Sequence, residues 1–251
     1  ASTAHGLPFI LCDGLGCDGY VWKYMRSHFG ERHPMIHIHY RGHGQSDIPT
    51  DITSVSIERS VKDLQGILAE LGLKQALFCG HSMGVQIALE YLRQQPAQVA
   101  GLLLLCGSYE FPIHTWHAAK DPSFPIPLSN RIMQKAFPLI SNSMIHFSRF
   151  LNPAWKRLMA TDLSFLISSR LELNADRVKK EDFMPYLKHL AGMDTRVFGQ
   201  MAKSVAEHSA ANLLESIEIP TLVVAGGQDT FTPAWLSQQM HWRIRGSEYL
   251  F

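Results

Sequence analysis

The sequence lacks the features that mark several large classes of protein. No apolar run approaches the roughly 20 residues needed to cross a bilayer, and residues 1–6 lack the basic and apolar regions of a signal peptide. The formal net charge is only +1 at pH 7, and Lys and Arg are scattered instead of forming runs that neutralise a line of phosphates. We therefore expect a cytoplasmic protein without a membrane span that does not bind nucleic acid.

Cysteine and glycine patterns exclude further kinds of site. The four cysteines include no C-x-x-C pair, so neither a zinc site nor a disulfide framework is indicated. Cys12, Cys79 and Cys106 lie in or beside apolar runs, and we interpret them as reduced, buried side chains. The two G-x-G segments, at 14–16 and 42–44, lack the third glycine of the dinucleotide-binding motif. We expect no metal and no organic cofactor.

Composition and periodicity predict the fold class. The 251 residues are 46% hydrophobic and 18% charged, which is typical of a globular chain long enough for one α/β domain with an insertion. Short apolar runs alternate with segments of helical periodicity. The expected strands lie at 8–12, 35–39, 76–79, 99–106 and 219–225, and the expected helices at 55–71 and 83–92. This alternation predicts a doubly wound, mostly parallel sheet.

The alternation stops between about Phe111 and Ala211, where several prolines separate helix-like stretches such as 130–137 and 193–207. We predict a helical cap at 111–211, inserted into a core domain made of residues 1–110 and 212–251. The insertion holds eight of the 13 Phe and six of the 10 Met. This composition suits the lining of an apolar cavity, although ordinary packing between helices explains it equally well.

The segment G-H-S-M-G at 80–84 carries the clearest chemical indication. It follows the expected strand at 76–79 directly and precedes the helical run at 85–91, so it fits G-x-S-x-G between a strand and a helix. Such a strained turn needs small flanking residues and presents the serine hydroxyl above the sheet edge. The N-terminus of the helix stabilises negative charge there. The motif predicts Ser82 as a nucleophile, with a plain tight turn as the alternative.

With this motif the chain resembles the α/β-hydrolase superfamily over nearly its whole length. The segment F-I-L-C-D-G-L-G at 9–16, followed by Trp22, is similar to the strand and oxyanion loop of that family, usually written H-G-x-G. The resemblance implies that the backbone N–H groups of Leu15 and Met83 form the oxyanion hole. Asp13 departs from the pattern, because it replaces the usual histidine and places a potential negative charge near the hole.

Two later segments extend the resemblance. Y-R-G-H-G-Q-S-D at 40–47 is similar to the family's R-G-x-G-x-S segment, a structural turn, so we expect no catalytic role for Arg41 or His43. I-P-T-L-V-V-A-G-G-Q-D at 219–229 resembles the strand and loop that present the acid of the catalytic triad, and the order Ser then Asp agrees with this fold. The resemblance therefore implies that Asp229 is the triad acid. The alternative is that Asp229 only caps the helix that follows.

The resemblance places the triad histidine in a loop beyond the last strand, of which 247–251 resembles only the beginning. His241 is the one histidine after Asp229, and it falls in the expected helix at 235–244, where the family has no base. We expect the catalytic histidine beyond Phe251, in a longer polypeptide. The family's β-hairpin before the first strand is absent too, so we expect both ends to be trimmed. The alternative is a natural chain that has lost its base.

Together the motif and the resemblance predict a carboxylesterase-like serine hydrolase that cleaves an ester or related acyl bond of a small, apolar substrate through an acyl-enzyme. Serine at the turn argues against relatives that use Asp there, such as haloalkane dehalogenases and epoxide hydrolases. Carbon-carbon bond hydrolases, cofactor-free haloperoxidases, thioesterases and acyltransferases remain open. So do a hydrolase-like ligand sensor with slow or no turnover, favoured by G-L-G-C-D at 14–18 with Trp22, and a non-catalytic structural paralogue.

Overall fold

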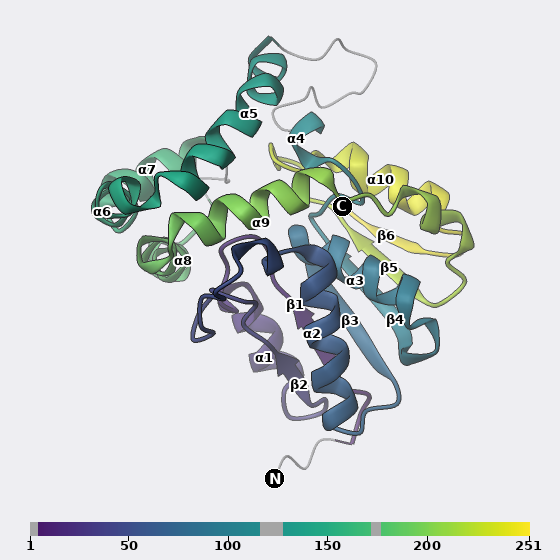
Figure 1. The fold of residues 1–251 in the computed structure, drawn as a ribbon. Coiled ribbons are helices and arrows are strands. Elements are labelled where there is room, and N and C mark those ends of the chain that lie inside the picture. The colour runs from purple at the N-terminus through teal and green to yellow at the C-terminus, as the bar shows by residue number, and fades with distance from the viewer. Residues whose placement is uncertain (1–4, 116–127, 172–176) are drawn as a thin grey trace.

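The computed structural model describes residues 5–115, 128–171 and 177–251 and contains a six-stranded sheet (Figure 1). The strands lie in the order β2-β1-β3-β4-β5-β6, and every neighbouring pair is parallel. Their bounds are β1 (Phe9–Cys12), β2 (Met35–His37), β3 (Ala76–His81), β4 (Val99–Leu105), β5 (Thr221–Val224) and β6 (Glu248–Leu250). The prediction of a doubly wound parallel sheet is confirmed.

The chain changes its direction of winding between the adjacent strands β1 and β3. From β1 it moves to β2 at one edge of the sheet, and after β3 it proceeds through β4 and β5 to β6 at the other edge. In open α/β sheets ligands bind outside the carboxyl ends of the strands at such a switch point. The topology therefore directs attention to the residues that follow β1 and β3.

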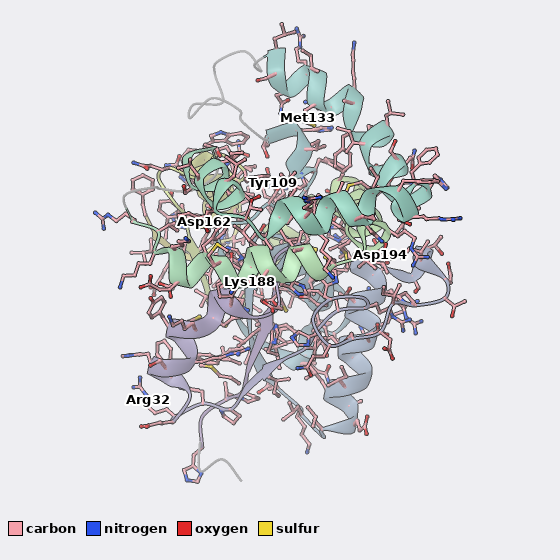
Figure 2. The ribbon with its side chains drawn as sticks, turned by 90° about the vertical axis from the view of Figure 1, so that its left-hand side faces the viewer. Arg32, Tyr109, Met133, Asp162, Lys188 and Asp194 are labelled. Atoms are coloured by element: carbon pink, nitrogen blue, oxygen red, sulfur yellow. The ribbon has the colours of Figure 1, made fainter. Side chains whose placement is uncertain are left out.

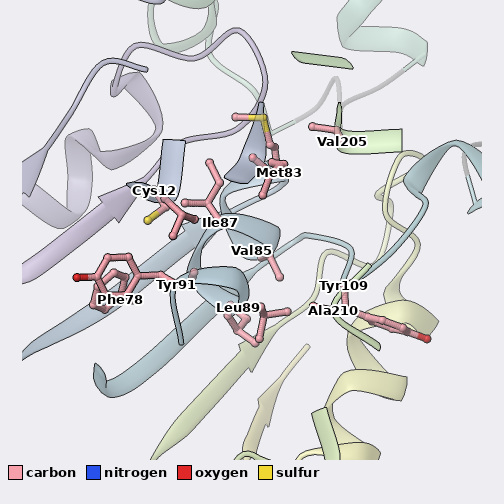
Figure 3. Close-up of a cluster of buried hydrophobic side chains, with 14 of the residues drawn as sticks. Cys12, Phe78, Met83, Val85, Ile87, Leu89, Tyr91, Tyr109, Val205 and Ala210 are labelled. Atoms are coloured by element: carbon pink, nitrogen blue, oxygen red, sulfur yellow. The ribbon is translucent and has the colours of Figure 1, made fainter. Parts of the chain in front are cut away.

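Helix α3 (Met83–Gln94) is the centre of the core. All of its residues from Met83 to Leu92 are buried, and it packs on β1, β3 and the neighbouring helix α2 (Ile57–Glu70). Figure 3 shows its side chains beside those of the sheet, where the rings of Phe78 and Tyr91 lie 4.4 Å apart. Burial on every side explains why the α3 sequence is apolar almost throughout.

At their carboxyl ends, β2 and β3 each differ by two residues from the expected strands. β2 ends at His37 and not at His39, because the backbone at His39 bonds to the following turn: its carbonyl accepts from the Ser46 hydroxyl at 2.7 Å. The ring of His39 also accepts from the backbone N–H of Gln45 at 3.1 Å. β3 continues through His81, so the strand runs directly into the turn that contains Ser82.

Six α-helices lie between β4 and β5 in the described part of the insertion. They are α4 (Pro112–Thr115), α5 (Leu128–His146), α6 (Ser148–Met159), α7 (Asp162–Leu171), α8 (Lys180–Gly192) and α9 (Thr195–Glu207). Residues 116–127 and 172–176 of the expected insertion lie outside the described residues. α8 contacts the short helix Tyr20–Trp22 after β1, and α9 contacts α2, so the insertion sits over the carboxyl ends of the strands (Figure 1).

The remaining helices of the core are short. α1 (Lys23–Phe29) precedes β2, and α10 (Ala234–Arg243) packs on β5 and β6. Within the three described ranges, no helix has the length and the apolar character that a membrane span requires. The cysteines are free thiols; Cys12, Cys17 and Cys79 are buried and Cys106 is half-buried. Burial raises the pKa of the Cys79 thiol to about 12, so it is neutral at physiological pH.

Gly66 and Gly72 provide a matched test of backbone energetics in α2. Gly66 is exposed inside the helix, and an added Cβ meets nothing within 4 Å. We expect Gly66→Ala to raise the free energy of unfolding by about 0.5–1 kcal/mol, because alanine loses less backbone entropy on folding. Gly72 follows Leu71, the C-cap of α2, with φ +65°, and an added Cβ there also meets nothing within 4 Å. We expect Gly72→Ala to lower the free energy of unfolding by about 1 kcal/mol, because alanine is strained at a positive φ. Urea denaturation of both variants measures the two changes; equal signs would contradict this account.

Candidate active site

Ser82, Cys106 and Asp229 follow three neighbouring parallel strands, β3, β4 and β5. The first two positions continue the ladder: the Ser82 N–H donates to the Leu105 carbonyl at 3.1 Å, and the Cys106 N–H donates to the Val224 carbonyl at 2.9 Å. Parallel strands end at the same edge of a sheet, so the chain following β3 lies two strand spacings, about 10 Å, from the chain following β5. The topology thus brings the serine and the aspartate to one edge.

Ser82 has a strained backbone. Its φ of 54° and ψ of −118° lie outside the regions that a residue with a side chain normally adopts. Serine at the start of a helix usually accepts a hydrogen bond from the first turn, but the Ser82 side chain makes no such cap bond with α3. Instead the Ser82 carbonyl accepts from the Val85 N–H at 3.1 Å. The turn is therefore stabilised by a hydrogen bond of the Ser82 main chain, and the Ser82 hydroxyl does not take part in capping α3.

Three glycines allow this turn because main chains touch there. A Cβ on Gly84 would lie 1.9 Å from the Cys12 carbonyl oxygen, and one on Gly80 would lie 2.5 Å from the Gly84 carbonyl oxygen. A Cβ on Gly107, after β4, would lie 2.6 Å from the Ser82 carbonyl oxygen. Separations under 3 Å are overlaps that a backbone atom cannot avoid by rotation. The glycine spacing of the motif is thus a requirement of packing α3 against β1 and β3.

The loop after β1 lies directly against Ser82. A Cβ on Gly14 would be 3.1 Å from the Ser82 Cβ and 3.2 Å from Nδ1 of His81. Met83 is the first residue of α3, so its N–H has no acceptor within the helix. Leu15 follows Gly14 in this loop, and its carbonyl accepts from the Tyr186 hydroxyl at 3.5 Å. The two residues expected to form the oxyanion hole therefore lie on the two segments that flank the serine.

Asp13 is buried and connects the loop after β1 to two neighbouring elements. Its Oδ1 accepts from the Trp22 indole N–H at 2.6 Å, and its Oδ2 lies 2.7 Å from Nε2 of His37. Both carboxylate oxygens are therefore engaged by ring nitrogens of η1 (Tyr20–Trp22) and β2. The sequence drew attention to the charge of Asp13 but gave no sign of these partners, which are 9 and 24 residues away.

Asp229 organises the turn that precedes α10. Its Oδ1 accepts from the N–H groups of Phe231 and Thr232, both at 2.9 Å, and its Oδ2 accepts from the Thr232 hydroxyl at 2.8 Å. The N-cap position of α10 belongs to Pro233, so Asp229 stabilises the turn without being the cap itself. A carboxylate has about four lone-pair sites, and these three bonds leave one for a further donor.

Cys106 lies beside Asp229 at the sheet edge. A Cβ placed on Gly226 would be 3.5 Å from both the Cys106 Sγ and the Asp229 Cβ. Burial, with a further contribution from the Asp229 charge, raises the pKa of the Cys106 thiol to about 11. The thiol is consequently protonated at neutral pH and is a poor nucleophile.

The histidines of this region have separate environments. Burial lowers the pKa of His81, against the opposing charges of Asp13 and Asp229, so a neutral imidazole precedes Ser82. His241 lies in α10, where its Nδ1 is 2.9 Å from the Ser247 hydroxyl and its ring stacks on Tyr249 at 5.4 Å. The structure thus places His241 in the contact between α10 and the chain leading into β6.

The turn at 40–47 is attached to the core by an ion pair with α2 and by a buried histidine. Arg41 donates to both carboxylate oxygens of Asp63 in α2, at 2.6 and 2.9 Å. His43 is fully buried, with its Nδ1 3.2 Å from the Arg41 carbonyl oxygen. Burial lowers the pKa of His43 to about 4. These contacts anchor the turn that joins β2 to the segment leading into α2.

Helix α8 covers the loop after β1. A Cβ on Gly16 would be 2.5 Å from a methyl group of Leu190, and the rings of Tyr20 and Tyr186 are 5.2 Å apart. Figure 2 looks onto this side of the molecule, where Lys188 marks α8. Among the phenylalanines of the insertion, Phe183 is buried beside Tyr186, Phe147 and Phe150 are exposed, and the other described ones are half-buried. Phe124 lies outside the described residues.

Comparisons with known proteins agree with this fold. Residues 8–127 match the family model described as the alpha/beta hydrolase fold. The AB hydrolase superfamily protein YisY of Bacillus subtilis is 23% identical, with 97% of this chain and 82% of that protein covered. The 3-oxoadipate enol-lactonase 1 of Acinetobacter baylyi is 21% identical, with 96% and 78% covered.

Solved structures share the fold. An esterase from Exiguobacterium antarcticum superposes with a TM-score of 0.69 at 18% identity, covering 98% of this chain and 83% of that one. A bromoperoxidase from Bacillus anthracis superposes with a TM-score of 0.73 at 17% identity, with the same coverage. The parallel sheet, the serine turn between β3 and α3, and these matches together show that the chain has the α/β-hydrolase fold.

Removing the Asp13 carboxylate tests its role behind the loop. Asp13→Ala leaves the buried indole N–H of Trp22 and the ring of His37 without their acceptor, so we expect the free energy of unfolding to fall by about 2–4 kcal/mol. Trp22→Phe keeps an aromatic ring at this position and removes only the hydrogen bond to Asp13. We therefore expect it to lower the free energy of unfolding by less than Asp13→Ala does. Chemical denaturation measures both; an Asp13→Ala variant as stable as the original protein would show that the contacts carry no stability.

The buried His43 should make stability depend on pH. Its folded pKa of about 4 lies below the unfolded value, about 6.5, so below pH 6.5 the unfolded chain binds a proton that the folded chain does not. The stability is full above pH 6.5 and declines as the pH falls toward 4, by about 2 kcal/mol at pH 5. In urea denaturation, His43→Gln should reduce the difference between the free energies of unfolding at pH 7 and at pH 5. His28→Gln, at an exposed position, should preserve it.

Proposed function

We propose that this protein is a serine hydrolase that cleaves an ester or related acyl bond of a small, apolar substrate through an acyl-enzyme. Ser82 is the nucleophile, and the N–H groups of Leu15 and Met83 form the oxyanion hole. The observation that carries the proposal is the strained backbone of Ser82, at a glycine-packed turn where its side chain makes no cap bond with α3. Strain of this kind persists only where the surrounding structure enforces it, and it is characteristic of functional sites.

The proposed reaction begins with attack of the Ser82 hydroxyl oxygen on the substrate carbonyl while a base takes the proton. The resulting oxyanion accepts hydrogen bonds from the Met83 and Leu15 N–H groups, and the N-terminus of α3 adds its favourable dipole. Collapse of this intermediate expels the alcohol, which receives the proton from the base. Water then attacks the acyl-enzyme by the same route and releases the acid.

The base in this proposal is a histidine oriented by Asp229. About 10 Å separates the chain after β3 from the chain after β5, which is too far for a direct bond between Ser82 and Asp229 and leaves room for one imidazole between them. The open acceptor site on the Asp229 carboxylate suits the N–H of that imidazole. Without the imidazole, activity should fall by several orders of magnitude.

The named relatives support acyl-bond cleavage as the reaction class. A segment of 110 residues is 30% identical to the pimeloyl-[acyl-carrier protein] methyl ester esterase of Methylococcus capsulatus, covering 44% of this chain and 41% of that protein. A structural neighbour, Est816, is described as an N-acyl homoserine lactone degrading enzyme, with a TM-score of 0.69 and 23% identity, covering 98% of this chain and 84% of that one. Esters and lactones share the acyl C–O bond that Ser82 would cleave.

Fluorophosphonate labelling and a panel of nitrophenyl esters test the proposal on the complete natural polypeptide. We expect the protein to be labelled and Ser82→Ala to abolish labelling and lower turnover by about 10³-fold or more, because no other group would form the acyl-enzyme. Asp229→Asn should lower turnover by a similar order while leaving the protein folded.

Ser237→Ala is the matched control, since the Ser237 hydroxyl is buried in α10 without a hydrogen-bond partner. It should keep both labelling and turnover. A complete protein that is neither labelled nor active, yet is stabilised against heat by an apolar ester or lactone, would replace the hydrolase proposal with the ligand-sensor alternative.

A further inference from the structure

The inserted helices expose an unusual amount of apolar surface. Of the 19 large hydrophobic side chains that are exposed among the described residues, 11 lie on α5–α7 and the residue between α5 and α6. They are Leu128, Ile132, Leu139, Ile140, Phe147, Phe150, Leu151, Leu158, Leu163, Leu166 and Ile167. Single exposed hydrophobic residues are normal on protein surfaces, but a concentration of this kind marks an interaction site. We call these residues the outer helical surface.

Helix α6 shows that this exposure follows helical geometry. Trp155 and Met159 pack inward: the Trp155 indole N–H donates to the Leu190 carbonyl at 2.6 Å. Phe150 and Leu158 point outward and are 73% and 51% exposed. α6 therefore has an apolar side toward the core and a second apolar side toward solvent. Folding of the core accounts only for the first.

Helices α7 and α5 repeat the arrangement. In α7, the half-buried Phe165 has its ring centroid 6.3 Å from that of Phe183, while Leu163, Leu166 and Ile167 are exposed at the i, i+3, i+4 spacing of one helical side. α5 packs along α9 and exposes four apolar side chains from Leu128 to Ile140. Figure 1 shows α6 and α7 at the end of the insertion farthest from β6 and α10.

The charge on this part of the chain is almost entirely positive. Residues 128–169 contain five Lys or Arg and one acidic residue, Asp162. The five basic side chains are exposed: Arg131, Lys135, Arg149, Lys156 and Arg157. Asp162 is paired with Lys180 of α8 at 2.9 Å, so it does not offset them. The Arg149 guanidinium lies 5.9 Å from the Phe150 ring centroid, which puts a cation beside an exposed apolar side chain.

We propose that the outer helical surface binds the face of an anionic phospholipid membrane. Helices that combine exposed Phe and Leu with Lys and Arg lie in the lipid interface, with apolar side chains among the acyl chains and cations at the phosphates. A second copy fits the charges less well, because a two-fold dimer would set this basic surface against itself. The surface lies outside the candidate active site, and binding does not depend on the proposed hydrolysis.

Flotation with lipid vesicles tests the proposal on the complete protein. We expect binding to vesicles of phosphatidylcholine mixed with phosphatidylglycerol, and much weaker binding to phosphatidylcholine alone. Arg149→Gln and Arg157→Gln should each weaken binding about fivefold, as expected for a basic residue near an anionic surface. Phe150→Ser combined with Leu158→Ser should weaken it at least tenfold, since two apolar side chains no longer enter the interface.

Trp242→Ser is the matched control, because Trp242 is 70% exposed but lies on α10, away from the outer helical surface. It should bind vesicles as the original protein does, and an unchanged melting temperature shows that each variant is folded. Failure to float with the anionic vesicles would overturn the proposal. So would a concentration-dependent increase in mass that disappears with Phe150→Ser, because it would assign the surface to a second copy.

Discussion

The contact between the main chains of Gly84 and Cys12 is the constraint on which the candidate site depends. With only 1.9 Å between the Cys12 carbonyl oxygen and the place of a Cβ, α3 can approach β1 this closely only through glycine. The approach brings the first turn of α3 to the edge of the sheet and forces Ser82 into its strained conformation. The position of the hydroxyl and the direction of the Met83 N–H both follow from this packing.

The loop after β1 is fixed from two sides by unrelated interactions. On one side, the buried carboxylate of Asp13 contacts the Trp22 indole N–H and the His37 imidazole. Both of its oxygens therefore have polar partners, as a buried carboxylate requires. On the other side, Tyr186 and Leu190 of α8 pack on Leu15 and Gly16. A loop held in this way keeps its N–H groups in a fixed orientation, and such preorganisation is what the proposed oxyanion hole requires.

The insertion has two surfaces with different roles. The inner surface contributes Phe183, Leu187 and Val197 to the main hydrophobic cluster, so it is part of the folded core. The outer helical surface is apolar without burying its side chains, and the segment 128–169 that carries it has five exposed basic residues and one acidic residue. These properties cost stability in water, which is why a lipid surface is the partner proposed for it.

The sequence by itself determined the parallel sheet and the turn between β3 and α3, and it indicated that helices separate β4 from β5. These features are local: apolar runs of strand length, glycines at fixed spacing and a break in the alternation are all visible within short windows. Only the tertiary structure decided that Asp13 pairs with Trp22 and His37, that Asp229 binds the turn before α10, and which phenylalanines face solvent. A residue's neighbours across the fold depend on how helices rotate and pack, and the composition of a segment does not specify that rotation.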